Sequence, residues 1–317
     1  MHYQIRTTAQ SVITLYVLPE TTPIASSAQT NCVIPDHVLQ YVGDLSQAFH
    51  TLWLEITAMP PDPDTTKCEN SASGELSRQS DSTQSENLRQ MAHALTDIVP
   101  AYHTIAFAYD SSSVSNSIMK RAILASVAII KERWQQPHSK KPSAAARQVC
   151  LPVYYGDEVA WDLPELCGLT TLSKRDIIQQ HQNGIYRVSA VGFSPGFAYM
   201  QGLASVLQFP RLSAPRVQVP AGALAIAEHQ TAIYPQASPG GWRIIGHCPL
   251  PLFELSKLGG HHHGTASSGS AESLLTMGDE VRFQAVGKQD YLAILRDNRG
   301  YFAPSLRTVF PAELADG

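Results

Sequence analysis

The sequence predicts an α+β protein in which a small α/β domain, residues 1–134, precedes a β-barrel domain, residues 149–317. Three features lead to this prediction. The N-terminal part alternates short strand patterns with two long amphipathic helix patterns. Past Val149, Pro and Gly interrupt many short apolar runs, as is typical of all-β domains. Between the two parts, the prolines and bases of QQPHSKKPSAAAR mark residues 135–148 as a linker.

The first domain begins with two short strands, at Tyr3–Arg6 and Val12–Leu18. Apolar residues then recur in steps of four and three, which predicts a helix with one buried stripe and Pro35 suited to its first turn: Val38, Val42, Leu45, Phe49, Leu52 and Ile56. Residues 97–109 read as two more strands, and Ser113 or Ser115 can cap a second helix. Strands with helices packed on one face give an open sandwich that resembles a ferredoxin-like domain.

Polar sequence interrupts both domains. Residues 60–90 are rich in Ser, Asp, Thr and Glu and have little to bury, so we expect a disordered insertion there. A further polar loop at Gly259–Ser273 contains His261, His262 and His263. Consecutive histidines lack the spacing of a helical metal site and have no Cys or acidic cluster beside them, so we expect no physiological metal site on this chain.

The second domain opens with a short helix, because Ser173 and Asp176 have the spacing of a capping box and Asn183-Gly184 can end it. The remaining apolar runs are short and separated by turns: Tyr186–Val191, Val217–Val219, Ala223–Ala227, Thr231–Tyr234, Trp242–Ile245, Leu250–Phe253 and Val281–Ala285. This spacing predicts a β-barrel or sandwich.

Composition limits the function classes. Only 16% of residues are charged, against about 25% in an ordinary soluble domain, which suggests a membrane protein, a secreted β protein or a protein with a covered surface. No apolar run approaches a bilayer span and no signal peptide is recognisable. Five scattered cysteines indicate a reducing compartment, and a net charge of −4 offers no broad footprint for nucleic acid. We therefore expect a cytoplasmic protein with a covered surface.

The run Gly192–Gly196 matches the G-x-S-x-G pattern of serine hydrolases, but Pro195 follows the serine and has no N–H to donate to an oxyanion. A rigid Gly-Pro turn is the better interpretation. Phe193, Phe197 and Tyr199 around it are either core aromatics or the wall of a ligand site.

Two further motifs are candidate binding elements. Arg211 and Arg216 each follow a proline, and their planar guanidinium groups suit a carboxylate or phosphate. Alternatively, they are surface or ion-paired arginines. A Pro-Gly-Gly turn, where the backbone can approach a ligand, is surrounded by Tyr234, Ser238 and Trp242. Gln230 could form hydrogen bonds with a lactam or amide. Turn formation alone is the other explanation. No phosphate loop and no G-x-G-x-x-G helix start are present, so any nucleotide binds without a recognisable loop or on a partner.

The segment GFSPGFAYMQGL, followed by PRLSAPRVQVPAGALAIAEHQTAIYPQASPGGWRIIG, resembles the KipI/PxpB family, also called allophanate hydrolase subunit 1. The resemblance implies a cyclophilin-like β-barrel behind the α/β domain. It also implies a heteromeric complex with KipA/PxpC-type and PxpA-type subunits that opens the lactam 5-oxo-L-proline to L-glutamate, with ATP bound in the assembled complex.

Within this resemblance, Arg211 and Arg216 are expected to hold an anion, while Gln230 and the turn from Tyr234 to Trp242 position the ring. His247 replaces an arginine of the family pattern and is a further substrate-binding candidate. No residue is assigned as catalytic. The family also implies two alternatives: a KipI-like inhibitor of a sensor histidine kinase, or a component of allophanate or urea carboxylase metabolism. No biotin-attachment Met-Lys-Met is present.

Overall fold

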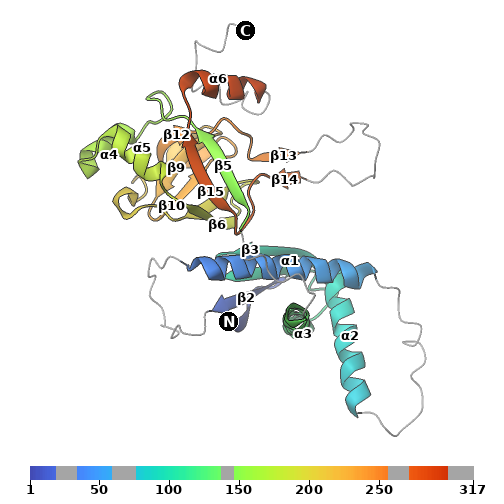
Figure 1. Cartoon of the computed structure of the whole chain (residues 1–317). Coiled ribbons are helices and arrows are strands. Elements are labelled where there is room, and N and C mark those ends of the chain that lie inside the picture. Colours follow the sequence, from blue (N-terminus) through green and yellow to red (C-terminus); the bar gives the residue numbers. More distant parts are fainter. Residues whose placement is uncertain (19–33, 59–75, 137–145, 256–270, 299–317) are drawn as a thin grey trace. The chain divides into compact units, whose positions relative to one another are not determined.

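The computed structural model describes residues 1–18, 34–58, 76–136, 146–255 and 271–298. These residues form two compact units, the first within residues 1–136 and the second within residues 146–298 (Figure 1). The His261–His263 run, most of the predicted linker and residues 60–75 of the predicted insertion lie outside the described residues. Within the described ranges, none of the helices has the length and apolar character needed to cross a bilayer.

The first unit contains an antiparallel four-stranded sheet in the order β1-β2-β4-β3. Its strands are β1 (His2–Ala9), β2 (Val12–Leu18), β3 (Leu95–Ala101) and β4 (Thr104–Tyr109). Alternate side chains of β2 and β4 are fully buried, among them Ile13, Leu15 and Phe107. This is the period of two expected of strands with one covered face, and it confirms the predicted strands.

Three helices pack together in this unit: α1 (Asp36–Ala58), α2 (Leu76–Ala94) and α3 (Asn116–Gln135). The apolar stripe predicted for α1 is buried. Of the two candidate caps for α3, the structure selects Ser115, whose hydroxyl accepts a hydrogen bond from the Ile118 N–H. Phe49 of α1 meets Phe107 of β4 edge to face, with ring centroids 4.8 Å apart.

Two predictions for this unit need correction. Residues 76–90 were expected to be disordered but lie in α2, because Leu88 and Met91, three residues apart, bury one helical face that the polar composition concealed. The ferredoxin-like connectivity is also incomplete. The path β2-α1-α2-β3-β4-α3 keeps the ferredoxin-like strand order but has an additional helix, and the place beside β2 is taken by β1, which precedes β2 in the sequence.

The second unit is built on a sheet in the order β12-β9-β10-β7-β6-β15-β5. These strands are β5 (Gln148–Val153), β6 (Tyr186–Val191), β7 (Ala198–Gln201), β9 (Ala223–Ala227), β10 (Gln230–Ile233), β12 (Arg243–His247) and β15 (Glu280–Ala285). All pairs are antiparallel except β15 with β5. Six of the seven predicted strands and the predicted capping box of Ser173 and Asp176 are confirmed. The run Leu250–Phe253 was wrongly predicted, since only its last residue lies in a strand.

Shorter elements complete the second unit. They are the strand pairs β8 (Arg216–Val219) with β11 (Ser238–Gly240) and β13 (Phe253–Leu255) with β14 (Ala271–Ser273), the helices α4 (Leu163–Thr170), α5 (Lys174–Gln182) and α6 (Lys288–Asp297), and a 3₁₀ turn at Ser205–Leu207. β14 forms the last three residues of the polar loop that the sequence predicted at Gly259–Ser273.

The described strands do not form the predicted closed barrel. β5 and β12, at the two ends of the sheet order, meet only through a single antiparallel bridge between Tyr154 and His247, the residues at their adjoining ends. Both backbone hydrogen bonds of this bridge measure 2.9 Å. The architecture is therefore a large, mostly antiparallel sheet, and the cyclophilin-like assignment stays a prediction.

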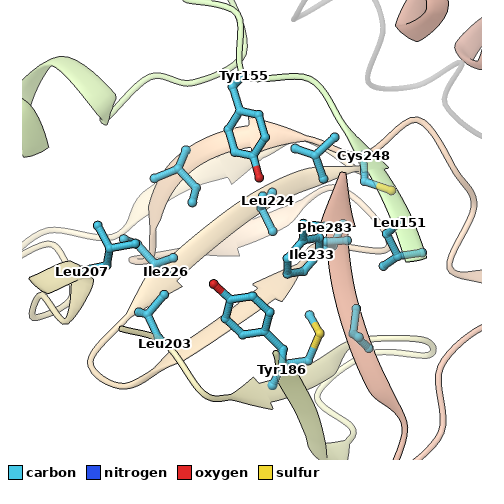
Figure 2. Close-up of a cluster of buried hydrophobic side chains, with 14 of the residues drawn as sticks. Leu151, Tyr155, Tyr186, Leu203, Leu207, Leu224, Ile226, Ile233, Cys248 and Phe283 are labelled. Atoms are coloured by element: carbon cyan, nitrogen blue, oxygen red, sulfur yellow. The ribbon is translucent and has the colours of Figure 1, made fainter. Parts of the chain in front are cut away.

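One face of this sheet carries the main core of the unit, which includes Leu224, Ile226, Ile233 and Phe283. Figure 2 shows Tyr155 and Tyr186 reaching into this core from opposite sides. Each fully buried aliphatic side chain contributes about 1.5–3 kcal/mol to folding. The alternate residues of β9 are alanines, and together with Ala232 of β10 they face away from this core into a second cluster.

A histidine of α5 is buried inside the main core. His181 Nε2 lies 3.2 Å from Thr231 Oγ1, and its Nδ1 lies 3.0 Å from the Tyr155 hydroxyl. Because Thr231 donates its own proton to the Ala225 carbonyl, the histidine donates from Nε2 and accepts the Tyr155 proton at Nδ1. Burial lowers the pKa of His181 to about 3, so the ring is neutral and structural.

Candidate functional site

The alanine face of β9 and β10 carries a group of large side chains that we call the aromatic–arginine cluster: Phe197, Tyr199, Tyr234, Trp242, Arg211 and Arg216. Ala223, Ala225 and Ala227 of β9 and Ala232 of β10 lie beneath the aromatic members. Small side chains at successive positions leave room for large rings above a sheet. The strand pattern thus prepares the surface on which this site is built.

Phe197 is the centre of the aromatic group. Its ring lies 5.3 Å from Tyr234 and 6.0 Å from Trp242, in both cases edge to face, and 4.8 Å from Tyr199. Edge-to-face contacts of this kind add about 0.5–1.5 kcal/mol to the free energy of burial. Phe197, Tyr234 and Trp242 are buried, whereas Tyr199 is partly exposed. The aromatics that the sequence left open between core and ligand wall are therefore mostly core, with Tyr199 at the border.

The Pro-Gly-Gly turn lies against Tyr234. A Cβ atom on Gly240 would lie 2.2 Å from the Tyr234 hydroxyl oxygen, so a larger residue there would displace the tyrosine ring. The backbone N–H of Trp242 donates to this hydroxyl; burial raises the pKa of Tyr234, and the hydrogen bond opposes that rise. Ser238 is half-buried in β11, opposite Val219 of β8. The turn thus fixes the tyrosine and the tryptophan relative to each other.

The two arginines both reach Trp242. The Arg211 guanidinium lies 5.9 Å from the centre of the Trp242 indole, and Arg216 Nη1 donates to the Trp242 carbonyl at 3.3 Å. Each arginine also has a carboxylate that the sequence did not reveal. Arg216 Nη2 lies 2.6 Å from Asp162 Oδ1, and Arg211 Nε lies 3.8 Å from a carboxylate oxygen of Glu228.

The acidic partners come from different parts of the chain. Asp162 precedes α4 and is buried, while Glu228 lies in the β9–β10 turn with a φ of 54°. Asp162 had a sequence signal, since an acidic residue just before Leu-Pro is typical of a helix start. Nothing in the sequence linked it to Arg216, which lies 54 positions away.

The structure places two predicted residues elsewhere. Gln230 is buried at the start of β10, opposite Gln201 and Ala227, at the other end of the strand from Tyr234. His247 lies in a different cluster beside Tyr291 of α6.

Both ring nitrogens of His247 are engaged. Nε2 donates to the Ala221 carbonyl at 2.8 Å, and Nδ1 lies 3.1 Å from the Tyr291 hydroxyl. Burial lowers the pKa of His247 to about 4. The ring is therefore neutral and ties α6 to the sheet, and these contacts explain its position without a substrate.

The Gly192–Gly196 turn joins β6 to β7 and presents Phe193 outward. Phe193 is 69% exposed and has a φ of 74°, a left-handed conformation that is rare for a bulky residue. Its ring lies 5.5 Å from that of Phe197, so it continues the aromatic cluster to the surface. Ser194 Oγ is buried, and no described group forms a hydrogen bond with it. The serine thus has no base beside it, in agreement with the rejection of a hydrolase elbow.

No metal centre emerges from the part of the chain that the structure describes, where no group of three or more His, Cys, Asp or Glu side chains could hold an ion. The chemistry available in the aromatic–arginine cluster is that of binding. It combines apolar ring faces, the Tyr234 hydroxyl and two guanidinium groups.

Comparison with known proteins agrees with the sequence motifs. Residues 63–259 match the family model described as carboxyltransferase domain, subdomain C and D. The 5-oxoprolinase B subunit of Bacillus subtilis (strain 168) is 32% identical over 207 residues, which cover 62% of this chain and 78% of that protein.

Two solved structures share the fold. TTHA0988 aligns with a TM-score of 0.53 and 26% identity over 81% of this chain, which spans only 39% of that protein. The Kluyveromyces lactis urea carboxylase aligns with a TM-score of 0.55 over 93% of this chain and 23% of its own length. At 12% identity, the second likeness concerns the fold alone.

Proposed function

Since the chain belongs to the carboxyltransferase subdomain C and D family, in its KipI/PxpB branch, we propose that it is one subunit of an ATP-dependent 5-oxoprolinase. In this proposal it acts with KipA/PxpC-type and PxpA-type subunits to open 5-oxo-L-proline to L-glutamate. The observation that carries the proposal is the 32% identity to the Bacillus subtilis 5-oxoprolinase B subunit, over most of that relative's length.

The aromatic–arginine cluster has chemistry that suits this substrate. 5-Oxoproline is a small, nearly flat ring with one carboxylate and one lactam amide. The partly exposed Tyr199, which packs against Trp242, offers a ring face to the apolar edge, and the exposed guanidinium of Arg211 can hold the carboxylate through two hydrogen bonds. The Tyr234 hydroxyl can pair with the amide.

Opening the ring requires coupling to ATP, because the lactam is a stable amide. In the proposed reaction the lactam oxygen attacks the γ-phosphorus of ATP and ADP leaves. Water then adds to the activated ring carbon and the carbon–nitrogen bond breaks, which leaves an acyl phosphate of glutamate. A second water hydrolyses this acyl phosphate and gives L-glutamate and phosphate. The sequence has no phosphate loop, so we propose that the nucleotide is bound in the assembled complex.

The partner subunit has a candidate contact in the exposed Phe193 turn. A large aromatic residue held outward in a left-handed conformation costs about 1–2 kcal/mol in backbone strain, and exposed aromatics are frequent anchors of protein interfaces. The same feature favours the second candidate function, a KipI-like inhibitor that binds a sensor histidine kinase. The carboxylase alternative has only the shared fold in its favour.

The test is co-expression with the two partner subunits, purification of the complex and measurement of ATP-dependent glutamate release from 5-oxo-L-proline. We expect Arg211→Ala and Arg216→Ala each to reduce turnover at low substrate. Arg175→Ala, on the exposed side of α5, is the matched control and should retain it. Wild-type turnover in both cluster variants would exclude this cluster as the site.

Phe193→Ser tests the partner contact in the same preparation. We expect it to reduce recovery of the KipA-type subunit while the chain itself stays folded. A verified complex that releases no glutamate would contradict the oxoprolinase proposal and favour the regulatory one, which is then tested as Phe193-dependent inhibition of kinase autophosphorylation.

A further inference from the structure

The two arginines of the cluster are held in different ways. Arg216 lies between three groups: the Asp162 carboxylate at 2.6 Å, the Trp242 carbonyl at 3.3 Å and the ring of Trp161, whose centre is 5.6 Å from the guanidinium carbon. Only 26% of its side chain is exposed. Its guanidinium is therefore fixed by the protein, and its charge is balanced by a buried carboxylate.

Arg211 has no such anchor. Its side chain is 56% exposed, and its ion pair with Glu228 is long, at 3.8 Å, with both groups in water. An exposed pair of this kind contributes little to stability, so a ligand anion can replace Glu228 at small cost.

The contacts of Asp162 with the rest of the fold direct its carboxylate toward Arg216. It stands at the start of α4, yet its side chain makes no capping bond to that helix. Oδ2 instead accepts from the Ile244 N–H at 2.5 Å, and the Asp162 N–H donates to the Ile244 carbonyl at 2.9 Å. These two bonds to β12 aim Oδ1 at Arg216 beside the Trp242 carbonyl.

We propose that Asp162 is a positioning residue, which fixes Arg216 against the carbonyl of Trp242 and thereby holds the indole in place, while Arg211 is the arginine that contacts the anionic group of the ligand. This inference rests on the proposed function of the cluster. It assigns different roles to two arginines that follow the same Pro-Arg pattern in the sequence.

The variant Asp162→Asn tests this role with little change in shape. The buried Ile244 N–H needs an acceptor, so the single amide oxygen stays with it and the amide NH₂ group faces Arg216. Two donors then oppose each other and Arg216 is displaced. In Arg216→Gln the new side chain carries a carbonyl oxygen. In the double variant, the amide NH₂ group introduced at position 162 can therefore donate a hydrogen bond to this oxygen.

The measurement is KM and kcat for 5-oxo-L-proline in the assembled complex. We expect Asp162→Asn and Arg216→Gln each to raise KM about tenfold, the effect of losing one hydrogen bond to a charged group, with kcat changed by less than about twofold. In the double variant KM should rise no further than in Arg216→Gln, because both substitutions remove the same contact. Asp157→Asn, which alters an exposed ion pair with Lys174, is the matched control and should leave both constants unchanged.

The outcomes separate this inference from the proposed function. If Arg211→Ala abolishes saturation by substrate while Asp162→Asn behaves as wild type, the inference is wrong and the site stands. If KM rises by the same factor with and without Arg216, Asp162 acts on the fold alone and the inference is wrong. Wild-type KM in Arg211→Ala overturns the role assigned to Arg211, and a verified complex without activity overturns the proposed function as well. If Asp162→Asn fails to fold, Arg216→Lys replaces it in the test. One ammonium group cannot bind the carboxylate and the carbonyl together as the guanidinium does. An unchanged KM in Arg216→Lys would therefore refute the positioning role.

Discussion

Lowering the pH from about 7.5 to about 5.5 should destabilise the second unit, because two of its histidines are buried in the neutral form. Burial lowers the pKa of His181 to about 3 and that of His247 to about 4, from an ordinary value of 6.5. In the unfolded chain both rings are in water and take up protons near pH 6.5. Their contribution to stability is therefore complete above pH 6.5 and declines as the pH falls toward 4 and then 3.

The size of the loss follows from these values. At about pH 5.5, one unit below the unfolded pKa, each histidine binds a proton in the unfolded chain and almost none in the folded chain, which costs about 1.4 kcal/mol. The two together lower the free energy of unfolding by roughly 2.8 kcal/mol, a large share of the 5–15 kcal/mol typical of a domain. The depressed pKa of Asp110, about 2, affects stability only at lower pH.

Urea unfolding at the two pH values measures the difference, followed by fluorescence of Trp161 and Trp242 in a chain that carries Trp53→Phe and Trp134→Phe. His247→Gln should reduce the pH-dependent loss by about half, whatever its effect on stability at pH 7.5. His37→Gln is the control, because His37 is exposed on α1 and its ring is in water in both states. Equal stability of the wild type at both pH values, or an undiminished loss in His247→Gln, would refute the neutral, buried state of these rings.

Three stability predictions concern the second unit, each measured by urea unfolding. Glu228→Gly removes a left-handed residue from the β9–β10 turn and should raise the free energy of unfolding by about 1 kcal/mol; a loss of stability would mean that the contact with Arg211 outweighs the strain. Gly222→Ala should cost more than about 2 kcal/mol, because φ is 83° and the new Cβ would lie 2.3 Å from the His247 ring; a neutral effect would refute this packing. Ser173→Ala removes the hydroxyl that accepts from the Asp176 N–H and should cost about 1 kcal/mol, although the backbone N–H of residue 173 still donates to Asp176; an unchanged midpoint would contradict the observed cap of α5.

Much of the local structure could be predicted from the sequence, because it depends on neighbouring residues. The steps of three and four from Val38 to Ile56 predicted α1, and the spacing of Ser173 and Asp176 predicted a helix start. α2 was missed because its apolar residues, such as Leu88 and Met91, are few and its helical state depends on packing against α1 and α3.

The candidate site was predictable in part. Arg211 and Trp242 belong to Pro- and Gly-rich motifs, which are typical of turns. The structure brings the side chains of these two residues together. Asp162 could not be assigned to the site, since its contact with Arg216 depends on the pairing of its backbone with β12. His247 was predicted to bind substrate because it replaces an arginine of the family pattern. Its hydrogen bonds with Ala221 and Tyr291 give it a structural role instead.

The parallel pairing of β5 with β15 has a consequence for how the chain folds during synthesis. Arg147, just before β5, pairs with Asp279, just before β15, across 132 residues of sequence. Contacts between such distant segments form slowly, because a long loop must close before any of them is gained. Until residues 280–285 have left the ribosome, β5 has no ladder partner and one edge of β6 is open. For most of its synthesis the second unit is therefore an incomplete sheet with bare strand edges, the state most exposed to mispairing and most dependent on protection by chaperones.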